Sequence, residues 1–459
     1  MNRILLPPQE EGPQPTAGSG RYYARFSQSE SFRGPGLGES RLWLFEAFDA
    51  GWFDEQERIA DIDFQRFYEQ AQLFVLELHV PESQLPRLGE LESLAKAEDG
   101  DDDDPDAWFS IQVQPLAARP LREDDLVAVV YFNLYLPGIP ARLLEAQSVD
   151  TTTAERLQQA VNIDHMGDAT EADVDTALAN VSPIPWIVVL DVGQGNAISL
   201  CNNSGSTEVY FDLGGGVLAN ASTFPAALRN FCFSQNPPII LSHWDFDHWS
   251  SGPRDPNSLG RIWIAPRQPV GPMHLAFMAT ITLAGQLLLL PQTFPAKWRG
   301  QLYLERCNGR GRNHSGLALT VSELPGGAGQ QMLFPGDARY PVVPSFNPAG
   351  YLSAVAPHHG GDMRNRTVPA CPHRSPSRLV YSYGDPNTFS HPRLITRTDH
   401  HAAGWTDRRL APGLPQYEVY ETAHRSPAML GHVLLSWRRT WGLPPVACGM
   451  RQCQLRAQQ

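Results

Sequence analysis

The sequence lacks any long apolar run. Among its 459 residues, uninterrupted apolar stretches such as Leu287–Leu290 and Val127–Val130 are short, whereas a membrane-spanning helix needs about 20 consecutive apolar residues. The first residues also lack the apolar core of a signal peptide. We therefore exclude an integral channel or transporter, and we expect a cytoplasmic protein with no membrane span.

Cysteine is scarce as well. The six cysteines, at positions 201, 232, 307, 371, 448 and 453, are too few for a disulfide framework in so long a chain. We expect reduced thiols, and only Cys448 and Cys453 are spaced as a candidate bridge or weak metal clip. Hydrophobic residues make up 42% of the chain. This content is enough for packed cores, and the length favours two or three domains.

Basic residues are scarce in the first part of the chain. Residues 1–182 hold 13 Lys and Arg against 34 Asp and Glu, a net charge of −21, whereas residues 183–459 hold 23 against 15, a net charge of +8. Twelve of the 14 histidines also lie in the second part. A basic, histidine-rich part fits an anionic substrate better than the total charge of −13 suggests.

The first part contains strand-like runs but no chemical motif. Apolar residues near helical spacing predict a helix over residues 55–72, and seven acidic residues within 98–106 predict an exposed loop. We divide the chain into a flexible lead (1–20), a small acidic α+β domain (21–145), a linker or helical segment (146–182) and a second domain (183–459). The predicted strands of the first domain are Arg21–Phe26, Arg41–Phe45, Phe74–Val80, Trp108–Val113 and Leu126–Leu136.

The densest cluster of potential ligands follows a predicted buried strand. Directly after Ile239–Leu241 come His243, Asp245, Asp247 and His248, four potential ligands within six residues. Two imidazoles and two carboxylates suit Zn, Mn or Fe. Burying several such groups without a metal would be costly, so the sequence predicts a metal site here.

Three more polar clusters follow predicted strands. Gly336-Asp337 ends one strand, His358-His359-Gly360 ends another, and Ser390-His391-Pro392 follows a third. Each signal is weak alone, because a histidine after a strand is often structural. Four strand-end clusters in this order are a much stronger indication of one site.

Taken in order, these motifs resemble those of the metallo-β-lactamase fold superfamily, and within it the hydrolase domain of ComEC-type DNA-uptake proteins. The resemblance covers about residues 183–398 and none of the first 180. The signature His-x-Asp-x-Asp-His matches residues 243–248. The other matching segments are Asp191-Val192-Gly193-Gln194-Gly195, Phe211-Asp212-Leu213-Gly214-Gly215, Asn313-His314-Ser315-Gly316-Leu317, Gly336-Asp337, His358-His359-Gly360 and Asn387-x-x-x-His391-Pro392.

The resemblance implies a fold and a ligand set. It implies an α/β protein whose second domain is a four-layer αββα sandwich and a hydrolase that uses two divalent metal ions, Zn or Mn. The implied first ion takes His243 and Asp245, with His314 or Asn313 as a third ligand. The implied second ion takes Asp247, His248 and one of His358 and His359, and Asp337 bridges the two ions. Asp247 and His391 are the implied catalytic residues; His391 would ligate a metal, bind a phosphoryl oxygen or protonate the leaving group.

The substrate contacts are less specific. We interpret Arg364, Arg366, Asn387 and Arg393 as candidates for contacts to substrate phosphates. Arg397, Arg408 and Arg409 extend the basic region, and Trp405 is a candidate for stacking on single-stranded bases; scattered solvated arginines are the alternative. His400 and His401 are either a further metal site or exposed loop residues.

Three functions remain open from the sequence. The first is a metal-dependent phosphodiesterase, a nuclease on DNA or RNA. The second is a hydrolase of a small ester, lactone or phosphoester, which a cleft walled by Trp244 and Trp249 would favour. The third is a regulatory protein whose acidic first domain binds a basic protein partner.

Overall fold

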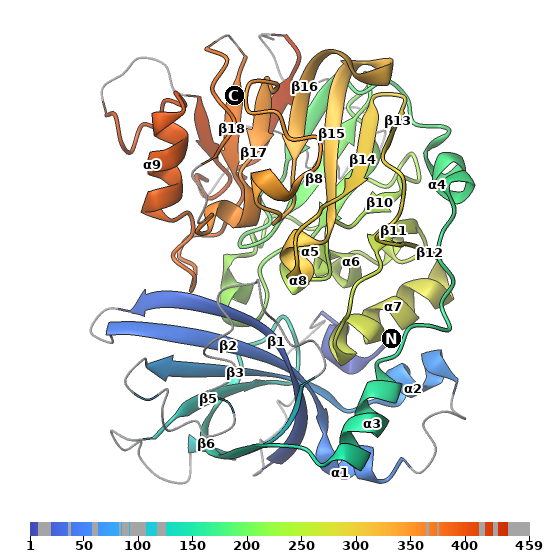
Figure 1. The fold of residues 1–459 in the computed structure, drawn as a ribbon, viewed down its shortest axis with the longest axis vertical. Helices are drawn as coiled ribbons and strands as arrows, with labels where there is room; N and C mark the ends of the chain where they lie inside the picture. Colours follow the sequence, from blue (N-terminus) through green and yellow to red (C-terminus); the bar gives the residue numbers. More distant parts are fainter. Residues whose placement is uncertain are drawn as a thin grey trace. The chain divides into compact units, whose positions relative to one another are not determined.

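The computed structural model describes residues 1–7, 20–34, 38–56, 63–81, 84, 91, 107–116, 125–363, 367–373, 376–412, 418–425 and 430–438. The chain divides into two compact units (Figure 1). The first unit is Met1–Met166 with Pro269–Leu283, and the second is Gly167–Gln268 with Ala284–Gln459. The division differs from the ranges expected from the sequence, because a segment of the second range belongs to the first unit.

The first unit contains a closed six-stranded barrel, where the sequence predicted a small α+β domain. Alternate residues of β3, such as Phe74, Leu76 and Leu78, fill the barrel core. Strand β6 was not predicted, because most of its side chains are at least partly exposed and carry no apolar alternation. The barrel order is β1-β2-β3-β5-β6-β4, with bounds β1 (Gly20–Gly34), β2 (Gly38–Asp49), β3 (Leu73–Pro81), β4 (Trp108–Pro115), β5 (Val127–Tyr131) and β6 (Ile139–Ser148).

Short helices accompany the barrel. They are α1 (Ala50–Asp54), α2 (Phe64–Gln70), α3 (Thr151–Ala160) and α7 (Pro272–Ala284). The helix predicted over 55–72 is only α2 among the described residues; it begins where the Asp63 side chain accepts a bond from the Arg66 N–H. The expected flexible lead is wrong for residues 1–7, because Ile4 and Leu5 are fully buried and the Asn2 amide donates to two backbone carbonyls.

Helix α7 explains why a boundary at residue 183 does not separate the units. This helix is apolar on all sides, as expected for a buried helix. At its start, the buried Glu46 carboxylate of the barrel accepts the Met273 N–H at 2.9 Å and lies 3.0 Å from His274 Nε2. The first unit therefore includes a segment that the chain reaches only after β11 of the second unit.

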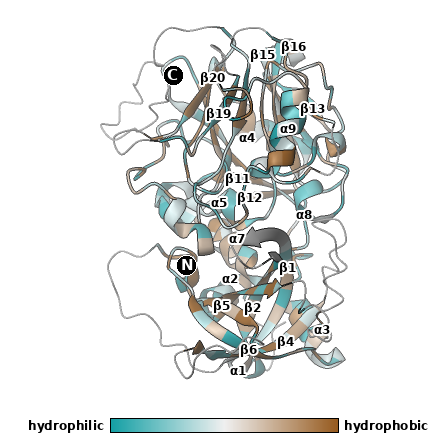
Figure 2. Cartoon of the chain, turned by 90° about the vertical axis from the view of Figure 1, so that its left-hand side faces the viewer, coloured by the Kyte–Doolittle hydropathy of each residue, from teal (hydrophilic) through white to brown (hydrophobic). Residues whose placement is uncertain are grey.

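The second unit contains two seven-stranded sheets. Their inner faces share one apolar core, in which the Phe211 and Phe334 rings lie 6.5 Å apart, and Figure 2 shows hydrophobic residues along these strands. The first sheet has the order β12-β11-β10-β9-β8-β7-β20 and the second β13-β14-β15-β16-β17-β18-β19. The bounds are β7 (Trp186–Val189), β8 (Ala197–Cys201), β9 (Thr207–Leu213), β10 (Ile239–Ile240), β11 (Ile262–Pro266), β12 (Gln286–Leu290), β13 (Lys297–Arg299), β14 (Leu302–Arg306), β15 (Leu317–Leu324), β16 (Ala328–Phe334), β17 (Ser353–Val355), β18 (Arg378–Tyr381), β19 (Val419–Glu421) and β20 (Val433–Ser436).

The helices of the second unit are short. They are α4 (Glu171–Leu178), α5 (Phe246–Trp249), α6 (Ser251–Arg254), α8 (Gly311–His314) and α9 (Leu394–Ala402). The protein is thus mixed α/β and consists mainly of sheets. Cys201, Cys232, Cys307 and Cys371 are buried and form no disulfide, and Cys448 and Cys453 lie outside the described residues. Within the described part of the chain, we find no helix long and apolar enough to cross a membrane.

Helix α9 corrects several interpretations of the basic region. His400 lies in this helix, buried between two tyrosines: its Nδ1–H donates to the Thr396 carbonyl at 2.9 Å, and its Nε2 lies 3.1 Å from the Tyr340 hydroxyl. His400 is therefore neither an exposed loop residue nor placed for a metal. Arg397 is also buried, and it pairs with Asp407 and Glu421 at 2.7 and 2.8 Å, so it does not contact a substrate.

The burial of His400 predicts a pH dependence of stability. Burial lowers the pKa of His400 to about 4, below the value of about 6.5 in an unfolded chain. The unfolded state therefore takes up a proton at this residue more readily than the folded state does. The contribution of neutral His400 to the free energy of unfolding is complete above pH 6.5 and is lost as the pH falls toward 4. At pH 5 the cost is about 2 kcal/mol. In urea denaturation at pH 7.5 and pH 5, we expect His400→Gln to lose less stability than the wild type.

His401→Gln is the matched control, since His401 is the exposed neighbour on the same helix. It should keep the wild-type difference between the two pH values. An equal loss of stability in His400→Gln and in the wild type would contradict the prediction.

Candidate metal centre

The candidate metal centre lies where parallel strands end. In the first sheet β9 and β10 are parallel neighbours, and in the second sheet β16, β17 and β18 are parallel neighbours. Parallel strands bring their carboxyl ends to the same edge, which is where ligands bind in open α/β sheets. His243–His248 follow β10, Asp337 follows β16, His358 and His359 follow β17, and His391 follows β18.

Asp337 lies at the centre of four histidines. Its carboxylate is 4% exposed, and each of the four Nε2 atoms lies within 4 Å of one of its oxygens. From Oδ1 the distances are 3.0 Å to His248 and 3.9 Å to His359, and from Oδ2 they are 3.7 Å to His243 and 3.8 Å to His358. The structure therefore places the Asp337 carboxylate among four of the predicted histidines.

Three of these histidines have the other ring nitrogen fixed. His248 Nδ1–H donates to Asp212 Oδ2 at 2.8 Å, and His359 Nδ1–H donates to the Ser382 carbonyl at 2.7 Å. His243 Nδ1 lies 3.0 Å from Ser242 Oγ. Such partners fix the tautomer of a metal-ligating histidine and leave the Nε2 lone pair directed into the site.

Asp247 is a second carboxylate in the cluster. Its Oδ2 lies 3.1 Å from His359 Nε2, and its Oδ1 lies 3.8 Å from His248 Nε2. Its position depends on two glycines, because the Asp247 carbonyl occupies the place of a side chain at each. An added Cβ would meet this carbonyl oxygen at 1.6 Å from Gly214 and at 2.6 Å from Gly195. The loop that carries His243–His248, here called the motif loop, can thus approach the two glycine turns that the sequence singled out.

The electrostatics of the cluster favour a bound cation. Burial raises the pKa of Asp337, but the surrounding histidines together lower this pKa well below the usual value. Burial lowers the pKa of His248, but Asp337 and Asp212 outweigh it and hold this pKa well above 6.5. The pKa of His359 is raised in the same way by Asp337 and Asp247 against the effect of burial. A divalent cation would replace the protons that this site otherwise attracts.

The described residues contain two groups that fit a metal ion. These are His243, His248 and Asp337, and Asp247, His248 and His359, with ligand atoms within 4.8 Å of one another in each group. The Nε2 atoms of His243, His248 and His359 are buried and lack a hydrogen-bond partner. Buried imidazole nitrogens without hydrogen bonds, facing carboxylates, suit a metal. Of the two adjacent histidines, His359 belongs to such a group, whereas His358 does not.

Besides His358, two predicted ligands, Asp245 and His314, lie outside both groups. Asp245 is next to the cluster, with Oδ2 at 3.3 Å from His243 Nε2, but its Oδ1 lies 3.4 Å from Arg312 NH2. His314 is buried at the end of α8. The next strand, β15, joins the motif loop where the Leu317 N–H donates to the Ser242 carbonyl at 2.6 Å. Asp245 and His314 are thus near the motif loop without forming a metal group.

His391 lies beside the cluster, and its surroundings disfavour the protonated imidazole. Its ring centre is 5.2 Å from that of His358 and 6.3 Å from that of His359. Burial and these two histidines hold the pKa of His391 well below 6.5. A pKa held this low makes His391 poorly suited to protonate a leaving group at pH 7, which favours the other two implied roles, metal ligand or hydrogen-bond partner.

Asn387 and Arg393 shape the loop around His391. The Asn387 amide donates to the carbonyls of Gly384 and His391, and its oxygen accepts the N–H groups of Phe389 and His391, all at 2.8 to 3.1 Å. The prediction that Asn387 binds substrate is therefore wrong, because its hydrogen-bonding capacity is used by the loop. The Arg393 N–H donates to the Gly360 carbonyl at 2.8 Å, where α9 begins.

The aromatic residues near the motifs do not form a cleft. Trp244, Trp249 and Trp405 are all fully buried, and the ring nitrogens of Trp244 and Trp405 donate to the carbonyls of Pro266 and Pro369. These tryptophans can neither wall a cleft nor stack on bases, which corrects both predictions. Arg364, Arg366 and the acidic run 98–106 lie outside the described residues.

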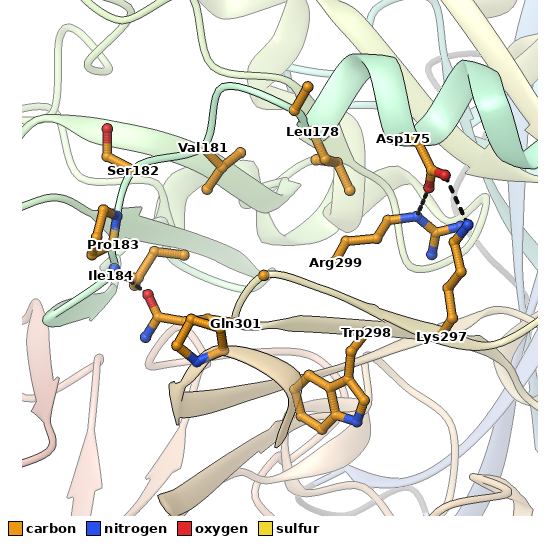
Figure 3. Close-up of a pocket in the computed structure, with 13 residues that line it drawn as sticks. Asp175, Leu178, Val181, Ser182, Pro183, Ile184, Lys297, Trp298, Arg299 and Gln301 are labelled. Atoms are coloured by element: carbon orange, nitrogen blue, oxygen red, sulfur yellow. Dashed lines mark hydrogen bonds and ion pairs between the residues drawn. The ribbon is translucent and has the colours of Figure 1, made fainter. Parts of the chain in front are cut away.

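A pocket of about 470 Å³ lies elsewhere on the second unit, between α4 and β13. Figure 3 shows Asp175 of α4 between Lys297 and Arg299, and it bonds to both at 2.7 Å. None of the clustered histidines or aspartates lines this pocket. The pocket is therefore not part of the metal centre.

Comparison of the sequence with protein-family models and with curated proteins yields no match. The site is thus interpreted from its own geometry. Sequence reasoning missed the roles of Ser242, Ser382 and Arg312. None of them is a typical metal ligand, so the sequence carried no signal for their contacts to the ligands. Asp212 carried a signal, a carboxylate at the end of a buried strand.

The role of Asp212 can be tested by Asp212→Asn. Because this change removes the charge that holds His248 Nδ1–H, we expect the affinity for Mn²⁺ or Zn²⁺ to fall by about 10- to 100-fold. Titration against a competing chelator measures this change. Ser242→Ala is a milder variant that removes the Oγ contacts to His243, His248 and Asp212 but keeps the Asp212 charge, and Asp164→Asn, at an exposed position, is the control. Unchanged affinity in a folded Asp212→Asn protein would contradict the assignment.

Proposed function

We propose that the protein is a metal-dependent hydrolase of phosphodiester bonds, a nuclease on DNA or RNA. The observation that carries the proposal is the Asp337 carboxylate surrounded by four histidine Nε2 atoms, with Asp247 facing His359 at 3.1 Å. A set of imidazoles and carboxylates with fixed tautomers suits Zn or Mn. We further propose that the second unit is a four-layer αββα sandwich of the metallo-β-lactamase fold superfamily, of the ComEC-like type. The shared core of its two sheets supports this fold.

The chemistry follows from the ligands present. Divalent ions at such a centre lower the pKa of water toward neutrality and polarise a phosphoryl oxygen. Asp247, His248 and His359 would hold one ion, and Asp337 would bridge toward a second. Asp247 is the most exposed of these ligands, at 22% of its side chain, so it faces the solvent from which the attacking water comes. A second ion would need Asp245 as a ligand.

The charge distribution supports an anionic substrate. The part of the chain that holds the centre has a net charge of +8, and positive potential attracts polyanions such as nucleic acids. A cleft walled by Trp244 and Trp249 would have favoured the small-ester alternative, but both side chains are buried. The acidic first unit as the binding site for a basic protein remains a prediction.

The direct test is cleavage of labelled single- and double-stranded DNA and RNA with Mn²⁺ or Zn²⁺ added. We expect the wild type to cleave at least one of them, and Asp247→Asn to lose about 100-fold or more of the rate, because a ligand and the charge it supplies are removed. Asp164→Asn makes the same chemical change at an exposed position of the first unit and should retain full activity. A protein that binds the metal but cleaves no nucleic acid would contradict the nuclease proposal.

His391 provides a second, independent prediction. Because the pKa of its imidazole is held low, we expect His391→Gln, which keeps a hydrogen-bonding group, to lose less activity than Asp247→Asn. Between pH 6 and 8, the pH–rate profiles of the wild type and of His391→Gln should have the same shape. A rate profile in which an acidic limb in this range vanishes in His391→Gln would overturn the assignment.

A further inference from the structure

A buried guanidinium lies at the edge of the metal centre. Arg312 of α8 has its NH2 atom 3.4 Å from Asp245 Oδ1, and the two side chains are only 11% and 8% exposed. The other oxygen of Asp245 lies 3.3 Å from His243 Nε2. Asp245 is thus shared between the cluster and a permanent positive charge.

The number of lone pairs limits how many ions the cluster can hold. Both candidate groups use His248, but His248 has one nitrogen available, because its Nδ1–H is bonded to Asp212. If His248 serves the ion held by Asp247 and His359, the other group retains His243 and Asp337. Asp245 is the further carboxylate that the structure places beside His243, and Arg312 pairs with it at 3.4 Å.

The segment that carries Arg312 is held in place. The Gln268 amide donates to the Arg312 carbonyl at 2.7 Å and to Ser315 Oγ at 2.8 Å, and its oxygen accepts the Trp244 N–H at 3.3 Å. Gln268 thus connects α8 directly to the motif loop. By contrast Arg310, two residues earlier, is exposed.

We propose that Arg312 takes the electrostatic role of a second metal ion, so that the centre holds one firmly bound ion through Asp247, His248 and His359. The proposal rests on the proposed function. A guanidinium is always charged and pairs with phosphate oxygens through a planar fork of N–H donors. It also repels a cation bound to the same carboxylate. The substrate class that this arrangement selects is a phosphoryl anion, held between one metal ion and one arginine.

The metal stoichiometry tests the first half of the proposal. Metal-free wild-type protein titrated with Mn²⁺ should bind one ion per chain. Arg312→Gln should bind a second ion at least about tenfold more tightly than any weak second binding in the wild type, because the competing charge has gone. Arg310→Gln makes the same charge change at the exposed position and should bind one ion like the wild type.

Binding of inorganic phosphate tests the second half. With one Mn²⁺ bound, Arg312→Gln should bind phosphate about 10- to 100-fold more weakly than the wild type, the expected effect of losing a charged hydrogen bond. Arg312→Lys keeps the charge but not the fork and should fall between the two. Arg310→Gln should bind phosphate like the wild type.

Two results would overturn the inference. One is a wild-type protein that binds two ions of similar affinity, and the other is an Arg312→Gln protein that matches the wild type in both metal stoichiometry and phosphate affinity. Asp247→Asn separates this failure from that of the proposed function. If Asp247→Asn binds the first ion as the wild type does, the metal centre itself is wrong. If it loses that ion while Arg312→Gln has no effect, only the role of Arg312 is wrong.

Discussion

The candidate centre depends on one buried carboxylate, that of Asp212. Removing a carboxylate from water is costly unless hydrogen bonds satisfy it. Asp212 is fully buried and accepts from the N–H and Oγ of Ser242, from the Asn196 amide and from His248 Nδ1–H, at 2.6 to 2.9 Å. Since Ser242 Oγ donates to Asp212, its oxygen accepts the Nδ1–H of His243. A single carboxylate thus fixes the tautomers of two histidines.

The loop that carries His243–His248 also packs closely against two glycines. His243 and His248 can present Nε2 to Asp337 only while the loop between them is pressed against the ends of β8 and β9. This approach requires Gly195 and Gly214, where a side chain would collide with the Asp247 carbonyl. Packing of the loop backbone thus fixes the positions of the ligand side chains. Substituting either glycine would therefore displace Asp247, although every candidate ligand residue would still be present.

The sequence predicted the centre better than its surroundings. Strand-end clusters carry their own signal, because polar residues directly after a buried apolar run are unusual, so Asp337 and His359 were found. Asn387 was misassigned because an amide in a loop looks the same whether it binds substrate or its own backbone. The tryptophans were misplaced because the sequence around a polar motif does not tell which neighbouring side chains are buried. The barrel was missed because β6 has no alternation and the barrel closes through non-local pairing of β1 with β4.

The domain boundary failed for a different reason, which is topological. A boundary at residue 183 assumes that each unit is continuous, yet α7 belongs to the first unit while it connects β11 to β12 of the second. Inside the first unit, the buried pair of Glu46 and His274 attaches this helix to the barrel. A chain that began near residue 182 would keep α7 and lose Glu46, leaving the buried His274 of this helix without its carboxylate. The first unit thus contains a segment that links two neighbouring strands of the second along the chain.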